Sequence, residues 1–221
     1  MRLGALARVT ARRFVRGRTL WICIAIALLP IAFAAALRGN RQFAKYAFQI
    51  EELMLVLLPS IVVASAVSGD LEDRAATYLW SRPLARWHLV VGKLLVLAPF
   101  VLALVVAGWL GAYAVGARQL ATGAQVGALA LGALAACALA AGIAVLSPRY
   151  GMVVAIVYLL CDGVVGQIPA HVQLVSIAHD VAQLAGMAGP GGGDLAAAIG
   201  LAAVPITWLA VGLSKIRRLE T

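Results

Sequence analysis

Residues 94–117 read LLVLAPFVLALVVAGWLGAYAVGA, a run of 24 residues without a charged side chain. A helix needs about 20 apolar residues to cross the hydrocarbon core of a bilayer. Because that core offers no water to the backbone, the segment must close its hydrogen bonds internally, as a helix does. The run therefore predicts one complete membrane span.

Five further apolar segments of similar length occur on both sides of this run. Together they predict six spans, at residues 19–37, 48–69, 88–117, 121–146, 150–170 and 195–214. The 221 residues are 63% apolar and 12% charged, whereas soluble domains have about 45–50% and about 25%. This composition excludes a disordered chain and argues against a soluble domain, which could not bury so much apolar surface. We predict a single all-α membrane domain over residues 1–221.

The distribution of basic residues predicts the orientation of the spans. If the N-terminus is cytoplasmic, 14 of the 18 Lys and Arg residues lie in the inner segments, as the positive-inside rule requires. We therefore expect both termini in the cytoplasm. The net charge of +9 then reflects topology, and we expect membrane lipid and no nucleic acid as a partner. Arg and Ala are abundant, which is typical of GC-rich bacterial genomes and favours the cytoplasmic (inner) membrane of a bacterium.

Three further predictions concern the N-terminal segment, the segment before the last span, and the small residues within the spans. Residues 1–18 place Leu3, Leu6, Thr10 and Phe14 on one helical face and Arg8, Arg12 and Arg16 on another, the pattern of an amphipathic helix at the membrane surface. Residues 171–193 predict a re-entrant or helical segment at the outer surface. Small residues recur at four-residue spacing, which lets helices approach closely; they are Gly108, Ala112 and Gly116, and Ala128, Gly132, Ala136 and Ala140.

The segment between the second and third spans is rich in charged and aromatic residues. Asp70 is a suitable N-cap, and Glu72 and Asp73 suit the positive first turn of a helix. Pro83 disfavours helical geometry at the residue before it. These residues predict a short cytoplasmic helix over residues 70–82, held between two spans.

This segment resembles the permeases of ABC-2-type ATP-binding cassette exporters. The residues that match the family pattern are Glu72, Thr77, Leu79, Ser81, Pro83, Arg86, Gly92 and Lys93, with Ala76 in place of the usual glycine and Trp80 in place of a frequent leucine. The whole chain is similar in its N-terminal helix, six spans and outer helical segment.

The resemblance implies a transport subunit that forms the translocation path and is not itself an enzyme. A separate cytoplasmic ATPase would bind ATP and Mg, and this chain would need no cofactor; the sequence indeed contains no G-x-x-x-x-G-K-[ST] motif. A second permease, identical or different, would complete the path. The residues expected to couple to the ATPase are Asp70, Glu72, Asp73, Arg74, Thr77, Tyr78, Trp80, Pro83 and Arg86.

Three acidic residues are candidates for the translocation path. Asp162 lies in the outer half of the fifth span, where a carboxylate is a functional-site candidate. It either faces the path or pairs with Gln125 or Gln167. Glu51 and Glu52 are candidates too, although their place near Lys45 favours the outer membrane interface.

Two other functions compete with this interpretation. A membrane-embedded enzyme could use His171, His179 and Asp180 for metal or base chemistry. No H-E-x-x-H or G-x-S-x-G motif accompanies them, so we interpret the two histidines as surface residues of an outer helix. A stand-alone secondary carrier would normally show inverted repeats with buried ion-binding residues, and the sequence lacks both.

Overall fold

The computed structural model describes residues 8, 10–12, 14–15, 17–40, 42–72, 87–117, 121–168, 173, 175–188 and 193–218. No β-strand occurs within these ranges. Six helical stretches are long and apolar enough to cross a membrane: Arg18–Ala36, Phe43–Leu71, Trp87–Gly116, Gly123–Leu146, Pro148–Val165 and Asp194–Ile216. The prediction of an all-α protein with six spans is confirmed.

Three of the spans are built from more than one helical element. The first consists of α2 (Arg18–Ala27) and α3 (Leu29–Ala36), and the second of α4 (Phe43–Pro59), the π-helix η1 (Ser60–Ala64) and α5 (Ser65–Glu72). The others are α7 (Trp87–Gly116), α8 (Gly123–Leu146), the 3-10 turn η2 (Pro148–Tyr150) with α9 (Gly151–Val165), and α11 (Asp194–Arg218). The short helix α10 (Ile177–Leu184) precedes α11.

The first two spans differ from their predicted form. The first is interrupted at Leu28, two residues before Pro30, which has no N–H to continue the helix. The second begins at Phe43, five residues earlier than expected, because the Phe43 ring packs edge-on against Tyr113 of α7 at 5.7 Å. Phe43 and Ala47 are thus buried in the bundle, whereas Lys45 and Tyr46 between them are exposed.

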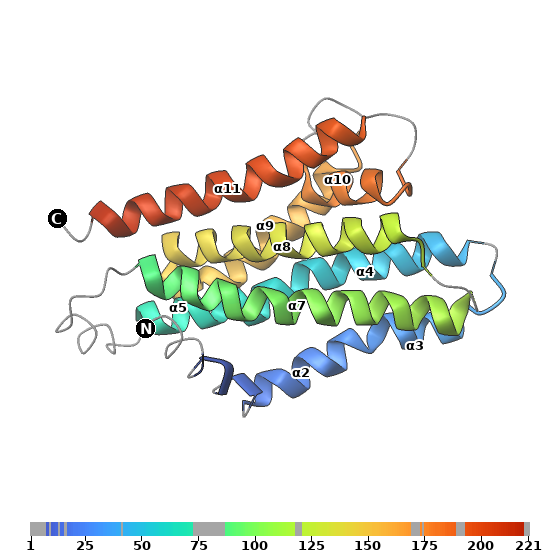
Figure 1. Ribbon diagram of the computed structural model, residues 1–221, viewed down its shortest axis with the longest axis horizontal. Coiled ribbons are helices and arrows are strands. Elements are labelled where there is room, and N and C mark those ends of the chain that lie inside the picture. Colours follow the sequence, from blue (N-terminus) through green and yellow to red (C-terminus); the bar gives the residue numbers. More distant parts are fainter. Residues whose placement is uncertain are drawn as a thin grey trace.

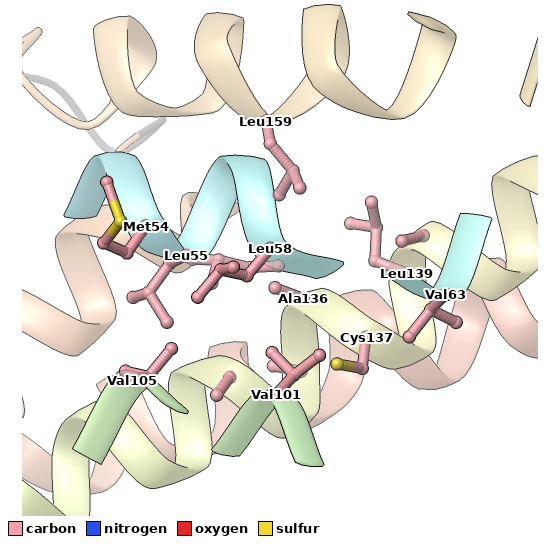
Figure 2. Packing of buried hydrophobic residues seen from close by; sticks show 14 of the residues in the cluster. Met54, Leu55, Leu58, Val63, Val101, Val105, Ala136, Cys137, Leu139 and Leu159 are labelled. Atoms are coloured by element: carbon pink, nitrogen blue, oxygen red, sulfur yellow. The ribbon is translucent and has the colours of Figure 1, made fainter. Parts of the chain in front are cut away.

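Helix α8 occupies the centre of the bundle, with α11 on one side and α4 and α7 on the other (Figure 1). Its small residues Ala128, Gly132, Ala136 and Ala140 are all buried, as their four-residue spacing predicts. Figure 2 shows the resulting core, in which α4, α7, α8 and α9 meet. The residues labelled there include Met54, Leu55, Leu58, Val101, Val105, Cys137, Leu139 and Leu159.

The closest backbone contact joins α8 to α11. A Cβ added at Gly142 would lie 2.6 Å from the carbonyl oxygen of Trp208, and one added at Gly212 would lie 3.0 Å from the carbonyl oxygen of Gly142. Both helices therefore need glycine at their crossing, because a side chain on either would meet backbone atoms. Packing of this kind holds membrane helices together where lipid supplies no hydrophobic driving force.

The two ends of the bundle carry different elements (Figure 1). The end of α5, the start of α7 and the end of α11 lie at one end, and the start of α4 and α10 lie at the other. In the predicted orientation the first is the inner end and the second the outer end. The predicted helical segment at the outer surface is thus present as α10, which begins after Ser176, whose side chain accepts a hydrogen bond from the His179 N–H at 3.2 Å.

We expect Gly142→Ala to destabilise the protein by about 1–3 kcal/mol, the usual effect of forcing a methyl group into a packed contact. The added Cβ would meet the Trp208 backbone, which cannot rotate away. The thermal unfolding midpoint of the purified chain in nanodiscs measures the effect. Gly127→Ala is the matched control, because Gly127 lies in the same helix with nothing within 4 Å of an added Cβ. Equal midpoints for the two variants would contradict the close α8–α11 contact.

Candidate functional site

Polar side chains meet at the inner end of the bundle around Lys93. Its ammonium group lies 2.5 Å from the Oδ2 of Asp70 and also donates a hydrogen bond to the carbonyl oxygen of Ala66. The Lys93 side chain is 7% exposed and that of Asp70 31% exposed. One lysine of α7 thus joins two residues of α5, and we call Lys93, Asp70 and Ala66 the inner clamp.

The inner clamp corrects one prediction. Lys93 is the seventh residue of α7 and is buried. Asp70 is not the N-cap of a new helix, because α5 continues through it to Glu72. A carboxylate is unfavourable near a helix C-terminus, and the Lys93 charge compensates for it here.

A cavity of about 330 Å³ adjoins the inner clamp. It is lined by residues of the N-terminal segment, among them Thr10 and Phe14, and by Asp70 and Lys93. The Phe14 ring packs edge-on against Phe100 of α7 at 4.7 Å. In the described part of residues 1–18, Arg8 and Arg12 are exposed whereas Thr10 and Phe14 are half-buried, as an amphipathic helix requires.

Most of the predicted coupling residues lie outside the described residues. These are Asp73, Arg74, Thr77, Tyr78, Trp80, Pro83 and Arg86. Of the remaining two, Asp70 belongs to the inner clamp and Glu72 is the last residue of α5. The structure therefore defines both attachment points of the segment 73–86, the end of α5 and the start of α7.

The second span departs from α-helical geometry halfway along its length. The π-helix η1 follows Pro59, and the hydroxyls of Ser60, Ser65 and Ser68 donate to the carbonyl oxygens four residues earlier, at Val56, Ile61 and Ala64. Such bonds satisfy carbonyls that an irregular helix leaves free in a membrane. Helices bend at short π-helical segments and at serines whose hydroxyls donate to a carbonyl oxygen of the preceding turn.

At the outer end, Asp162 of α9 holds the start of α10. Its carboxylate accepts hydrogen bonds from the backbone N–H groups of Ile177 at 3.2 Å and Ala178 at 3.0 Å, and from the hydroxyl of Ser176 at 3.3 Å. Asp162 thus caps α10 across the tertiary structure and compensates for the partial positive charge of that helix end. Its partners are these three residues rather than Gln125 or Gln167. Gln125 instead caps α8 with Thr122 and donates to the Tyr113 hydroxyl.

A second carboxyl group, Asp180, lies close to Asp162. Asp180 is 1% exposed, and neither of its carboxyl oxygens has a hydrogen-bond partner among the described residues. Burial raises the pKa of Asp180 to about 7, and repulsion from Asp162 adds to the shift. Asp180 is therefore largely neutral below pH 7.

An open cavity of about 470 Å³ lies beside α10. Its polar lining comes from Lys45, Gln49 and Glu52 of α4, from Gln167 and Gln173, and from His179 of α10, and its apolar lining includes Phe48 and Met187. Residues 45, 49 and 52 share one helical face, so this lining could be recognised from their spacing. We call this space the outer cavity.

The two adjacent glutamates of α4 lie in different surroundings. Glu52 is half-buried and lines the outer cavity. Glu51 is fully buried against α7. Successive residues of a helix point about 100° apart, which separates the two carboxyl groups.

Two of the three residues considered for an enzyme lie among the described residues, and their surroundings differ. His171 lies outside the described residues, His179 lines the outer cavity, and Asp180 is buried. No group of three or more His, Cys, Asp or Glu residues with metal-binding geometry occurs within the described ranges. Ser176, which sequence analysis missed, is signalled by its place before the amphipathic stretch IAHDVAQL.

No protein-family model matches this chain, and a search of curated proteins finds no match.

We expect Lys93→Met to destabilise the chain by on the order of 2 kcal/mol, because the ion pair between Lys93 and Asp70 is lost; the loss is smaller than for a fully buried pair, since Asp70 is partly exposed. The double variant Lys93→Met with Asp70→Asn should recover much of the loss. The two thermal midpoints, measured side by side, test the inner clamp. Equal destabilisation in both variants would contradict the ion pair.

We expect the protein to lose stability as the pH rises from about 4 to about 7, because Asp180 binds a proton more tightly in the folded state than in the unfolded state. One pKa unit corresponds to about 1.4 kcal/mol, so the decrease amounts to a few kcal/mol at most. Asp180→Asn should remove this part of the pH dependence, whereas Asp194→Asn, at an exposed outer position, should retain it. Superimposable pH profiles for wild type and Asp180→Asn would exclude this role of Asp180.

Proposed function

We propose that this protein is the membrane-spanning permease subunit of an ABC-2-type exporter in the bacterial cytoplasmic membrane. In this proposal a separate ATPase binds ATP and Mg and docks at residues 70–86, and a second permease completes the path. The residues that match the family pattern, from Glu72 to Lys93, and the six spans support it. The observation that carries it is the inner clamp, because the clamp lies where the proposed docking segment leaves the bundle.

The inner clamp gives the segment 73–86 a firm mechanical connection to two spans. Helix α5 ends at Glu72 and α7 begins at Trp87, and Lys93 joins these two helices by an ion pair and a hydrogen bond. A displacement of the segment therefore moves both helix ends together. This arrangement explains why the lysine that matches the family pattern would be needed in a permease.

The irregular second span offers a route from the inner end to the outer cavity. Helix α5 carries the clamp, η1 follows Pro59 in the middle of the span, and α4 presents Lys45, Gln49 and Glu52 to the cavity. Helices bend at such interruptions, so a movement of α5 can change the angle of α4. In the proposed cycle, ATP-driven closure of the ATPases moves α5, and α4 changes the outer cavity in response.

Charge reversal at the docking segment tests the proposal. The chain is co-expressed with a candidate ABC ATPase subunit from the same genome, purified in nanodiscs, and assayed for co-purification and ATP hydrolysis. The variant Glu72→Lys with Asp73→Lys should lose co-purification and at least about tenfold in permease-stimulated hydrolysis, equal to about 1.4 kcal/mol of coupling free energy.

The matched control for that experiment is Asp194→Lys, an exposed acidic residue at the start of α11, at the opposite end of the bundle. It changes the net charge in the same direction and should leave both readouts unchanged. Wild-type hydrolysis in the Glu72 and Asp73 variant would refute docking at this segment.

A further inference from the structure

Glu51 is a carboxyl group without a partner in the middle of a helix contact. It lies in α4, its side chain is 0% exposed, and neither carboxyl oxygen has a hydrogen-bond partner among the described residues. No described Lys or Arg forms an ion pair with it. A buried polar group normally has such a partner, so this one requires an explanation.

The Glu51 carboxyl group faces Gly108 of the neighbouring helix α7, where no side chain is present. A Cβ added at Gly108 of α7 would lie 3.6 Å from Glu51 Oε1 and 3.7 Å from Oε2, and 3.3 Å from the carbonyl oxygen of Ala27. Three oxygen atoms from two residues therefore surround the position where α7 lacks a side chain. We call this contact between α2, α4 and α7 the glutamate seam.

The first span contributes the carbonyl oxygen of Ala27 to this contact. Ala27 is the last residue of α2, immediately before the break at Leu28. The three atoms nearest to the missing Gly108 side chain are thus this carbonyl oxygen and the two oxygens of the Glu51 carboxyl group.

An ionised carboxylate would be very unfavourable in these surroundings. Transfer of an unpaired charge into a medium of low dielectric constant costs many kcal/mol, and side chains avoid this by becoming neutral. A neutral carboxylic acid is also the form that can donate a hydrogen bond to a carbonyl oxygen. Both arguments favour a bound proton on Glu51.

A proton fits the glutamate seam better than a metal ion does. Hard cations such as Mg²⁺ and Ca²⁺ require six or more oxygen ligands in all. The seam brings together three oxygens from two residues, and no metal-binding group of His, Cys, Asp and Glu residues occurs in the described part of the chain. A single proton requires one oxygen to hold it and one to accept its hydrogen bond.

The other titratable groups on the helices of the seam lie elsewhere or are neutral. Glu52 and Lys45 of α4 line the outer cavity, and Lys93 of α7 belongs to the inner clamp. The remaining groups on these helices are Arg18 and Cys23 of α2, Tyr46 at the outer end of α4, and His88 and Tyr113 of α7. None of them forms a hydrogen bond or ion pair with Glu51.

We propose that Glu51 is a proton-binding site inside the bilayer, and that its bound proton keeps α2, α4 and α7 packed together at the glutamate seam. Loss of the proton would leave an uncompensated charge against Gly108 and Ala27, and the helices would have to separate to let water reach it. This inference concerns the isolated chain and does not depend on an ATPase partner.

Infrared spectroscopy of the purified chain in nanodiscs tests the proposal at pH 7. A protonated carboxyl group has a C=O stretching band well separated from the carboxylate bands. We expect Glu51→Gln to remove one component of the protonated band, and Glu52→Gln, the adjacent residue in the outer cavity, to leave that component in place. Loss of carboxylate intensity instead, with the protonated band intact, would overturn the proposal.

A second measurement avoids dependence on a folded Glu51 variant. The chain has four glutamates, at positions 51, 52, 72 and 220. In the Glu52→Gln background, ¹³C-labelling of glutamate should shift a component of the protonated band, because Glu51 is then the one buried glutamate within the described residues. Absence of any shift would show that Glu51 is ionised and would exclude the proton site.

Discussion

The bundle depends on close approach between helices that lipid does not drive together. Glycine and alanine provide this approach at three places: along α8, at the crossing of Gly142 with Trp208, and at Gly108 of α7. Because the backbones come so near to one another, each contact has a single well-defined geometry. The positions of the polar groups depend on this close packing. The inner clamp and the glutamate seam exist only where α7 lies directly against the first or the second span.

Polar groups are found at the ends of this packed core or in gaps within it. At the inner end an ion pair connects α5 to α7, and at the outer end Asp162 caps α10 while Glu52 lines an open cavity. The irregular second span links these two regions through η1. In the proposed permease this span would be the element that connects nucleotide-driven movement with the outer cavity.

Sequence analysis was most successful where a pattern repeats over many residues. Run length predicted all six spans, and the four-residue spacing of Gly132 and Ala136 predicted the buried face of α8. It failed for contacts between residues that are distant in the chain. The ion pair of Asp70 with Lys93 and the bonds from Asp162 to the start of α10 join separate helices, and no local pattern signals them. The different surroundings of Glu51 and Glu52 could not be predicted from the sequence either. Helix α4 is apolar on most sides, so its periodicity does not show which face meets α7.

The interruption at Leu28 has a further consequence for the first span. Helix α3 packs against α7, where the Ile31 side chain covers Gly111. Helix α2 begins next to residues that line the cavity beside the inner clamp. Both halves of this span therefore rest on α7, the outer half at Gly111 and the inner half at Gly108, where Ala27 closes the glutamate seam. The break at Leu28 lets each half follow the surface of α7 separately, which one continuous helix through Pro30 would not allow.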